Sequence, residues 1–396
     1  MRILINALSA KMGGATTYIR ELATEVSARG IAHDFVFLVP PEHVASVSEL
    51  APAARVISSH YSHATKAKRL WFDQVGLRRL LRDERIDILF STANFGLIAS
   101  PCYQLLLVCN TIYFSPLYRQ RYLHSFRQRL VHMLQRWLIW ISVHSCDVLL
   151  TPSRTMLAEL QQWMRIRATK AVAVIPYGVR HVSQPQAESS IAKESCTILF
   201  TSLYADHKNL GTLLTALRFL VKQDRDAHLL TTADPYWPAA RCTHDWQRDA
   251  RLARSPEILN RVHFVLKSAG QRPDELYRQA HIFVYPSVVE SFGHPLVEAM
   301  ASGLPIVAAD VPINREICGD AALFFQPFSP EDLGHTISQL MDEPSLAAEM
   351  SRRSLVRSQD FCWEKHLTTL LGLTRASEVT TDSTPVGMPV KVNPCP

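Results

Sequence analysis

Short apolar runs that are typical of buried strands alternate with longer segments of helical periodicity along almost the whole chain. We expect strands at residues 3–8, 34–39, 55–58, 86–90, 104–109, 148–150, 172–175, 197–201, 228–231, 262–265, 282–285, 305–308 and 323–325. Helical patterns, such as those of residues 17–28 and 121–143, lie between most of these runs. Repeated strand–helix units favour an α/β architecture with mostly parallel sheets.

The alternation is interrupted by the polar, turn-rich segment SQPQAESSIAKES at residues 183–195. Because 396 residues are more than one hydrophobic core usually serves, we expect this segment to link two domains, residues 1–182 and 196–360. Two doubly wound domains in series predict a cleft between the carboxyl ends of their sheets. Residues 376–396, rich in Thr, Ser, Pro and Val, are expected to form a disordered tail.

The formal net charge of +6 is distributed unevenly along the chain. Residues 1–180 contain 22 Lys and Arg against 11 Asp and Glu, a net charge of +11, whereas residues 181–396 contain 20 and 25, a net charge of −5. The basic half favours an anionic surface or an anionic substrate. Motifs typical of nucleic-acid binding are not found in the sequence, so we expect no nucleic-acid partner.

The cysteines and the amino-terminal residues both indicate the cellular compartment in which the protein works. The eight cysteines are scattered without CxxC pairs or zinc-ligand spacing, which suits a reducing environment. A strand-like run begins at Arg2, where a secretory signal would need a basic and then a longer apolar region. No apolar run reaches the roughly 18 residues of a membrane span. We therefore expect a cytoplasmic location.

The segment 290–298, Glu-Ser-Phe-Gly-His-Pro-Leu-Val-Glu, directly follows a strand-like run and its short loop. Pro295 suits the first position of a helix, so the amides of residues 292–294 would lie at a helix N-terminus that favours a phosphate or a developing anion. Two carboxylates at this spacing, Glu290 and Glu298, could accept hydrogen bonds from two sets of hydroxyl groups. The spacing alone fits equally well a loop carboxylate followed by a glutamate that complements the helix dipole.

With its surroundings, this segment resembles the Glu-x7-Glu motif of the family-4 retaining glycosyltransferases. The resemblance extends over FVYPS before the motif, EAMASGLPIVAAD at 298–310, Glu316, and GDAALFFQP at 319–327. It implies the GT-B fold, in which two Rossmann-like domains face each other across a cleft. It also implies that Glu290 contacts the donor sugar and Glu298 the nucleotide ribose. The other donor-binding residues of the motif would be Ser291, Phe292, Gly293 and His294. Ser291 and His294 replace the family's usual Gly and Leu, and the His294 change could alter the sugar preference.

The triplet His207-Lys208-Asn209 follows another expected strand. A lysine at a strand-to-helix turn can neutralise a diphosphate leaving group without a metal ion, although a lone turn lysine is more commonly only solvated. Under the resemblance, Lys208 matches the diphosphate-binding lysine of the family. Lys208 and Glu290 are then the expected catalytic residues, and His207 and Asn209 are expected to line the donor site.

The expected diphosphate site lacks one positive charge that many family members have. They carry an arginine shortly before the lysine, at positions that here hold Ser202 and Leu203. We expect His207 or a remote arginine to compensate.

Three further features follow strands of the first domain and would lie at the cleft. Gly13 and Gly14 let backbone amides approach a phosphate or sugar, although many such glycines serve only the turn. In the family pattern they match an amino-terminal Gly-Gly loop that binds the donor. Asn94 and Asn110 are expected on the acceptor side. Many relatives carry a His-Asp pair near the position of Asn110, and asparagine cannot act as a general acid or base. Its role would be positioning or, alternatively, that of a structural loop cap.

Residues 114–146 contain no acidic residue but five arginines, with Trp137 and Trp140 beside them. A basic helix with aromatic residues can lie on an anionic membrane face. A core helix with one solvated basic face fits the composition equally well. The resemblance favours the membrane interpretation, since many relatives use lipid-linked acceptors.

The resemblance as a whole implies a retaining, metal-independent glycosyltransferase without a cofactor. Residues 1–182 would form the acceptor side and residues 196–360 the nucleotide-sugar donor domain, with a helix at 361–375 returning to the first domain. The sugar would pass to a glycan or lipid-linked acceptor in surface polysaccharide or lipopolysaccharide synthesis, with possible peripheral membrane contact through the first domain. The main alternative is a catalytically inactive GT-B subunit that binds a sugar or a partner. A sugar epimerase would need acid and base residues that we do not identify.

Overall fold

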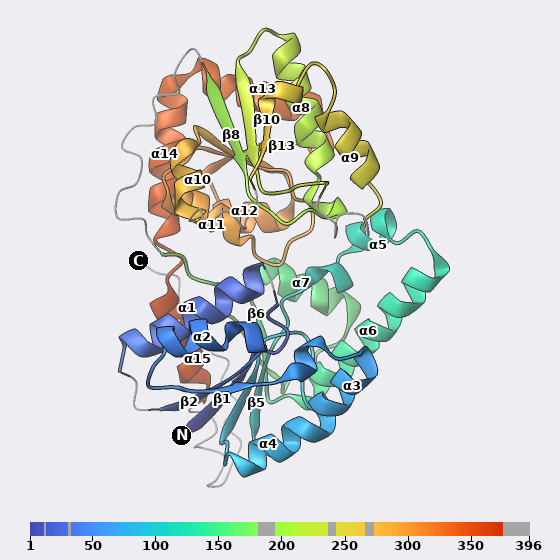
Figure 1. Cartoon of the computed structure of the whole chain (residues 1–396), viewed down its shortest axis with the longest axis vertical. Coiled ribbons are helices and arrows are strands. Elements are labelled where there is room, and N and C mark those ends of the chain that lie inside the picture. Colours follow the sequence, from blue (N-terminus) through green and yellow to red (C-terminus); the bar gives the residue numbers. More distant parts are fainter. Residues whose placement is uncertain (12, 31–32, 181–194, 237–242, 266–272, 375–396) are drawn as a thin grey trace.

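A computed structural model describes residues 1–11, 13–30, 33–180, 195–236, 243–265 and 273–374. These residues form two α/β domains, each built around one parallel sheet, and the two domains stack end to end along the long axis of the molecule (Figure 1). The expected tail lies outside the described residues, as does the expected linker except for its last residue.

The amino-terminal sheet has the strand order β3-β2-β1-β4-β5-β6-β7, and all its pairs are parallel. Its strands are β1 (Arg2–Asn6), β2 (Asp34–Val39), β3 (Arg55–Ser58), β4 (Ile88–Ser91), β5 (Tyr103–Leu107), β6 (Val148–Thr151) and β7 (Ala171–Val174). In the centre of the sheet, Ile5 lies opposite Phe37 on one side and Phe90 on the other. Central strands such as β4 and β6 are buried along their whole length, which explains why they are continuous apolar runs.

The carboxyl-terminal sheet repeats this topology with the order β10-β9-β8-β11-β12-β13. Its strands are β8 (Cys196–Phe200), β9 (Ala227–Thr231), β10 (Val262–Phe264), β11 (Ile282–Tyr285), β12 (Ile306–Ala309) and β13 (Ala322–Phe325). The order reverses between β1 and β4 in the first sheet and between β8 and β11 in the second. Doubly wound sheets bind ligands outside the carboxyl ends of their strands at such switch points.

Fifteen α-helices connect and cover the strands in the described part of the chain. They are α1 (Gly14–Ala28), α2 (Val44–Leu50), α3 (Lys66–Trp71), α4 (Leu77–Asp83), α5 (Pro116–Tyr122), α6 (Phe126–Ser145), α7 (Arg154–Trp163), α8 (Leu210–Lys222), α9 (Trp246–Ala253), α10 (Pro273–Gln279), α11 (His294–Ala301), α12 (Pro312–Cys318), α13 (Pro330–Asp342), α14 (Pro344–Ser358) and α15 (Trp363–Thr374). Short helical turns are η1 (Pro41–His43), η2 (His60–His63), η3 (Phe72–Gly76), η4 (Thr111–Tyr113), η5 (Asp206–Lys208) and η7 (Leu259–Arg261).

All the expected strands are present, with ends displaced by at most two residues. The single helix expected over residues 121–143 is wrong, because two helices, α5 and α6, occupy this region. The first ends at Tyr122, and Ser125 begins the second through a capping box. Its hydroxyl accepts the N–H of Gln128 (3.2 Å), and the Gln128 side chain accepts the N–H of Ser125 (3.0 Å). This reciprocal cap satisfies two N–H groups that a helix start otherwise leaves free.

The last helix, α15, packs against α1 of the amino-terminal domain (Figure 1). The Tyr18 hydroxyl donates to Nε2 of His366 (2.9 Å), and Nδ1 of the same ring donates to the carbonyl of Pro176 (2.8 Å). Both ring nitrogens are therefore used by a neutral imidazole. The His366 ring thus joins α15, α1 and the segment that leaves β7.

The two segments that pass between the domains lie side by side. The N–H of Val179, after β7, donates to the carbonyl of Phe361, before α15 (3.2 Å). A Cβ atom on Gly178 would lie 2.3 Å from the backbone nitrogen of Trp363. Only glycine allows this close approach of two backbones.

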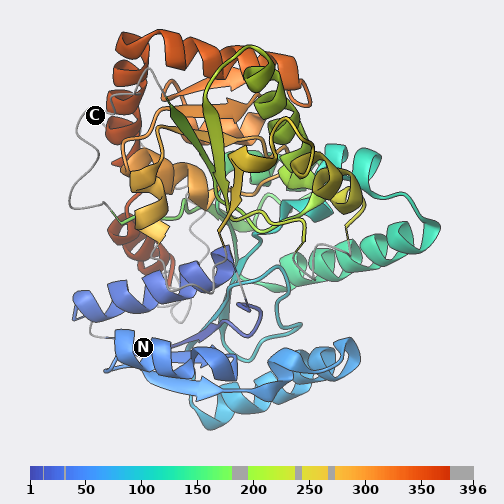
Figure 2. The ribbon, with the colours of Figure 1, turned by 45° about the horizontal axis from the view of Figure 1, so that its top comes forward.

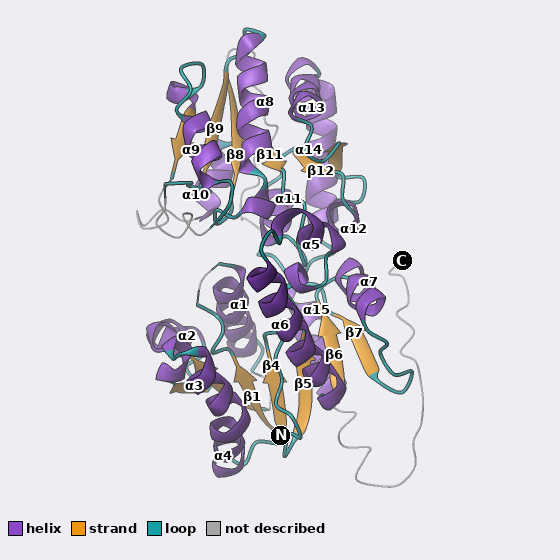
Figure 3. Ribbon diagram, turned by 90° about the vertical axis from the view of Figure 1, so that its right-hand side faces the viewer, coloured by secondary structure: helices purple, strands orange, loops and turns teal. Residues whose placement is uncertain are grey.

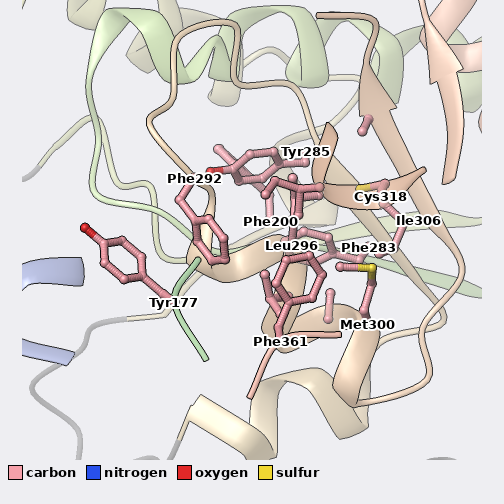
Figure 4. Close-up of a cluster of buried hydrophobic side chains, with 14 of the residues drawn as sticks. Tyr177, Phe200, Phe283, Tyr285, Phe292, Leu296, Met300, Ile306, Cys318 and Phe361 are labelled. Carbon is pink, nitrogen blue, oxygen red and sulfur yellow. The ribbon is translucent and has the colours of Figure 1, made fainter. Parts of the chain in front are cut away.

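Aromatic rings attach both crossing segments to the carboxyl-terminal core. Figure 4 shows Tyr177 and Phe361, one from each segment, beside Phe292. The Phe292 ring centre lies 5.0 Å from that of Tyr177 and 5.6 Å from that of Phe361. Phe292 itself precedes α11, so the crossing segments pack on the loop that leads into this helix.

We predict that His366 contributes to the acid sensitivity of the fold. Burial lowers its pKa to about 4, against about 6.5 for a free histidine. Between these values the unfolded chain binds more protons, so this contribution to stability is complete above about pH 6.5 and is lost as the pH falls toward about 4. His366→Asn should therefore flatten the pH dependence of the urea midpoint in this window, where the wild-type contribution changes by about 3 kcal/mol.

The matched control is His335→Asn, at an exposed histidine of α13. It should leave the slope of midpoint against pH as in the wild type. Equal slopes for the wild type and the His366 variant would contradict the prediction.

Candidate active site

The motif loops follow the strands that flank the two switch points. Residues 13–14 follow β1 and Asn94 follows β4, while residues 207–209 follow β8 and 290–294 follow β11. Figure 3 shows the amino-terminal strands running toward the other domain. The sequence motifs therefore come from the four strand ends at which a doubly wound fold binds ligands.

Direct contacts bring these loops together across the domain boundary. A Cβ atom on Gly14 would lie 3.1 Å from Cδ2 of His294, so the absence of a side chain lets the first loop touch the start of α11. A Cβ atom on Gly13 would lie 3.2 Å from Cδ1 of Leu203, which follows β8. The Ser153 hydroxyl, after β6, donates to the carbonyl of Ser291 (2.7 Å). The carboxyl ends of the two sheets thus face each other.

Lys208 and Glu290 form an ion pair at the switch point of the carboxyl-terminal sheet, with only 18% and 12% of their side chains exposed. The Tyr285 hydroxyl donates to the same Glu290 oxygen (2.6 Å). Burial alone would raise the pKa of Glu290, but the charge and hydrogen bond of Lys208, together with smaller contributions from His207 and the Tyr285 hydroxyl, hold the pKa below its usual value. Glu290 is therefore a carboxylate with a cation beside it, as its expected role requires.

His207 does not supply the positive charge that the missing arginine would provide. Burial lowers its pKa to about 4 and the neighbouring Lys208 adds to this effect, so the ring is neutral at pH 7. The His207 carbonyl accepts the N–H of Val288 (3.0 Å), which joins the loops after β8 and β11. The neutral ring makes a remote arginine the better candidate to compensate for the missing charge.

Asn209 connects the lysine turn to the same neighbouring loop. Its backbone is left-handed (φ 57°, ψ 38°), a conformation that asparagine tolerates better than most residues. Its side-chain amide donates to the carbonyl of Pro286 (3.3 Å) and accepts the Thr212 hydroxyl (2.8 Å). The buried Asn209 side chain therefore positions Lys208 at the start of α8.

A cavity of about 240 Å³ borders Asn209 between α5 and the carboxyl-terminal domain. Arg121 and Arg248 line it. Arg248 is paired with Asp245 and Asp249, whereas the Arg121 guanidinium lies over the ring of Phe328, 3.8 Å from its centre. Arg121 is thus the better placed of the two to act as the remote arginine.

The loop before α11 contains Gly293 in a left-handed backbone conformation, which glycine adopts readily. Gly293 has a φ of 92°, and a Cβ there would approach Leu296 to 3.2 Å. The helix begins at His294, one residue earlier than expected. The His294 ring stacks on Tyr177 with ring centres 4.6 Å apart and an angle of 3°, and burial lowers its pKa to about 4. His294 is therefore a neutral ring fixed between Gly14 and Tyr177, while Phe292 is a core residue (Figure 4).

Glu298 lies in α11, and Tyr277 determines its orientation. The Tyr277 hydroxyl donates to Glu298 Oε2 (2.6 Å) and lies 3.0 Å from the Thr201 hydroxyl. Thr201 follows β8 directly. Glu298 is thus placed beside the end of β8, the strand that leads to Lys208.

Asn94 and Asn110 are engaged within the amino-terminal domain. The Asn94 side-chain oxygen accepts the N–H groups of Cys109 (2.9 Å) and Asn110 (3.1 Å). The Asn110 side chain accepts the N–H of Ile112 (3.2 Å) and caps the η4 turn. Both asparagines join the loops after β4 and β5, and Asn110 has the cap role that the sequence left as the alternative.

Three residues outside the predicted site complete its framework. Tyr285 orients Glu290, and Ser153 holds the loop of Ser291. Glu316 of α12 accepts both backbone N–H groups of Arg154 and Thr155 (2.7 Å each) at the start of α7, in the other domain. Glu316 belongs to the segment that carries the resemblance, but its partners are some 160 positions away in sequence, so no local pattern could identify this contact.

Comparison with known proteins matches both halves of the chain to models of glycosyltransferase families. Residues 12–182 match the model described as "Glycosyltransferase Family 4", and residues 184–355 match "Glycosyl transferases group 1". The O-antigen chain mannosyltransferase B of Escherichia coli is 36% identical over 103 residues, which are 25% of this chain and 27% of that protein. The alignment therefore spans only about a quarter of that relative.

Solved structures of other proteins superpose on nearly the whole length of this chain. Sucrose-phosphate synthase from Thermosynechococcus elongatus superposes with a TM-score of 0.73 at 17% identity, covering 96% of this chain and 100% of that one. HepE from Anabaena, solved in complex with UDP-glucose, gives a TM-score of 0.71 at 16% identity, with 94% and 100% covered. At these identities the structures show a shared fold. With the two family models and the geometry of the facing sheets, they establish that this chain belongs to the family-4 glycosyltransferases and has the GT-B fold.

Proposed function

We propose that the chain is a retaining glycosyltransferase that moves a sugar from a nucleotide-sugar donor to a glycan or lipid-linked acceptor in surface-polysaccharide synthesis. The observation that carries the proposal is the buried Lys208–Glu290 pair at a switch point beside the start of α11. Such a pair offers a cation for a diphosphate and a carboxylate for sugar hydroxyls. The UDP-glucose of the HepE structure supports the donor class, and the O-antigen mannosyltransferase supports the pathway class.

Lys208 and the start of α11 would stabilise the leaving group. Cleavage of the bond between sugar and diphosphate leaves negative charge on the diphosphate. The N–H groups at the helix N-terminus near Gly293 are already oriented and stabilise this charge without reorganising. The ammonium of Lys208 adds to this once it has turned from Glu290 to the bound diphosphate. In a front-face substitution the leaving diphosphate itself takes the acceptor proton, so we assign no side-chain base and no metal ion.

Glu290 and Glu298 would bind the two ends of the donor. Lys208 turns from Glu290 to the diphosphate, which frees carboxylate lone pairs for the sugar hydroxyls. Tyr285 keeps Glu290 in place during this exchange. Glu298, oriented by Tyr277, would accept the ribose hydroxyls. The Gly13–Gly14 loop forms the opposite wall, next to the acceptor side.

The outer face of α6 suggests where an acceptor would come from. This helix projects from the body of the amino-terminal domain (Figure 2) and exposes an apolar surface made of Phe126, Leu130, Val131, Met133, Leu134, Trp137, Leu138 and Trp140. Phe126 is 79% exposed and Trp137 53%. The interpretation of a core helix with a solvated basic face does not fit these exposures. Among the helices that the structure describes, none has the length and hydropathy that a bilayer crossing demands.

We propose that this face rests on the cytoplasmic surface of an anionic membrane, since Arg127 and Arg129 flank its first turn.

The first prediction from the proposed function concerns Glu290→Gln. The amide keeps the shape but loses the charge that pairs with Lys208 and with the donor hydroxyls. We expect kcat/KM for sugar transfer to fall about 30- to 150-fold, equivalent to about 2–3 kcal/mol, with an unchanged circular dichroism spectrum. Glu257→Gln, which breaks the exposed pair with Arg218 in the same domain, should transfer like the wild type.

Near wild-type turnover in a folded Glu290 variant would end this assignment. A wild type that neither transfers nor hydrolyses any nucleotide sugar, yet binds one, would support the inactive sugar-binding subunit instead.

The second prediction concerns Lys208→Ala and the free nucleoside diphosphate. Removal of a charge-assisted contact should weaken UDP binding about tenfold or more in calorimetric titration. Lys222→Ala, at the other end of α8, removes the same charge outside the site and should bind UDP like the wild type. Unchanged UDP affinity in the Lys208 variant would place the diphosphate elsewhere.

The third prediction concerns vesicle binding. The wild type should co-sediment with vesicles that contain phosphatidylglycerol at low salt. Arg127→Glu/Arg129→Glu should lose the salt-sensitive part of this binding and Leu134→Ser/Trp137→Ser the salt-resistant part. Leu259→Ser/Val356→Ser, at exposed apolar residues of the other domain, is the control. A wild type that stays in the supernatant at low salt would refute membrane contact.

A further inference from the structure

Arg119 of α5 and Arg136 of α6 form a basic cluster with His132 of α6. Arg119 lies close enough to Arg136 for its positive charge to lower the pKa of Arg136. Both arginines lie close enough to His132 to lower the pKa of that ring. Burial lowers the pKa of Arg136 to about 10, with Arg119 adding to the effect, and burial likewise lowers the pKa of His132. The Arg136 guanidinium lies over the ring of Trp163, 4.5 Å from its centre. With a pKa of about 10, the Arg136 guanidinium remains charged at neutral pH.

No carboxylate among the described residues pairs with either guanidinium, and residues 114–146 contain no acid at all. Other arginines of the chain do have such partners, for example Arg69 with Asp73, Arg218 with Glu257 and Arg315 with Asp310. The Nε of Arg136 is buried without a hydrogen-bond partner in the described structure. Like charges held together and an unsatisfied buried donor both cost free energy, which a bound anion would recover.

The cluster lies one aromatic ring away from the lysine turn. The Tyr118 ring stacks on His132, with centres 6.4 Å apart and an angle of 15°, and meets His207 edge to face at 5.9 Å. His132 is fixed from the other side, because its Nε2 donates to the carbonyl of Ile112 (3.0 Å). An anion on Arg119 and Arg136 would therefore sit on the acceptor domain, beside the diphosphate site and separate from it.

We propose that Arg119 and Arg136 bind a phosphate or diphosphate group carried by the acceptor, and so place the acceptor next to the donor. Two guanidinium forks match the charge and geometry of such a group, which carries about two negative charges at pH 7. The inference rests on the proposed function, since it assigns a group of the acceptor at the same site. The phosphate could belong to a membrane lipid, because the exposed apolar surface lies on the same helix, or to a sugar phosphate in solution.

The test uses inorganic pyrophosphate as a probe, with saturating UDP present so that the Lys208 site is already filled. In calorimetric titration of the full chain, Arg119→Gln/Arg136→Gln should weaken pyrophosphate binding about tenfold or more. Arg165→Gln/Arg167→Gln, which removes the same charge from exposed positions after α7, should bind like the wild type. Since Arg136 packs on Trp163, the exposed single variant Arg119→Gln guards against misfolding and should also bind pyrophosphate more weakly.

A second arm distinguishes the two sources of the phosphate. Phosphatidylcholine vesicles with and without a polyisoprenyl phosphate are sedimented with the wild type and the double variant. Capture that needs the polyisoprenyl phosphate, Arg119 and Arg136, and that pyrophosphate displaces, supports a lipid-borne group. Pyrophosphate binding without such capture supports a soluble acceptor phosphate.

Equal pyrophosphate affinity in the wild type and both arginine variants, or no binding of either probe, would overturn the proposal. Because UDP binding is measured independently in the same samples, such a result would leave the donor site and the proposed transfer reaction standing. Loss of UDP binding in the wild type would instead point to failure of the proposed function itself.

Discussion

The buried ion pair between Lys208 and Glu290 fixes the two loops on which the carboxyl-terminal half of the site depends. Moving two charges out of water costs several kcal/mol per ion, so the pair needs further hydrogen bonds to be tolerated. Tyr285 supplies one to the carboxylate, while Asn209 and the His207 carbonyl join the backbones of the two loops. A hydrogen-bonded network of this kind favours one arrangement of its members. The start of α8 and the start of α11 are thereby placed relative to each other.

Several contacts between the domains lie at the loops that would bind substrate. Gly14 touches His294, Ser153 holds the carbonyl of Ser291, and Glu316 caps the start of α7. These contacts lie close to the strand ends. A movement that separated the domains would therefore break them and expose the site at the same time. The stacking of His294 on Tyr177 connects this motion to the segments that cross between the domains.

The sequence predicted the fold well because its signal is local and repeated. Each strand is an apolar run and each switch-point loop carries its own glycine, lysine or carboxylate, so the strands and the positions of Lys208 and Glu290 followed from short windows. The break at Ser125 was missed because helical periodicity continues through it and only the capping box reveals it. The protonation of His207 and the partner of Glu316 depend on side chains brought together by folding, and no window of the sequence contains both members of such contacts.

The return of α15 to the amino-terminal domain has a consequence for the order of synthesis. Tyr18 lies in the first helix to be made, and its hydrogen-bond partner His366 lies in the last helix of the described chain. A ribosome that adds about 5–20 residues per second delivers α15 roughly ten to forty seconds after β7. During that interval the apolar face of α1 around Tyr18 has no covering helix. The amino-terminal domain emerges before the other but is completed only when α15 has been made, so the nascent chain must keep this face from aggregating until then.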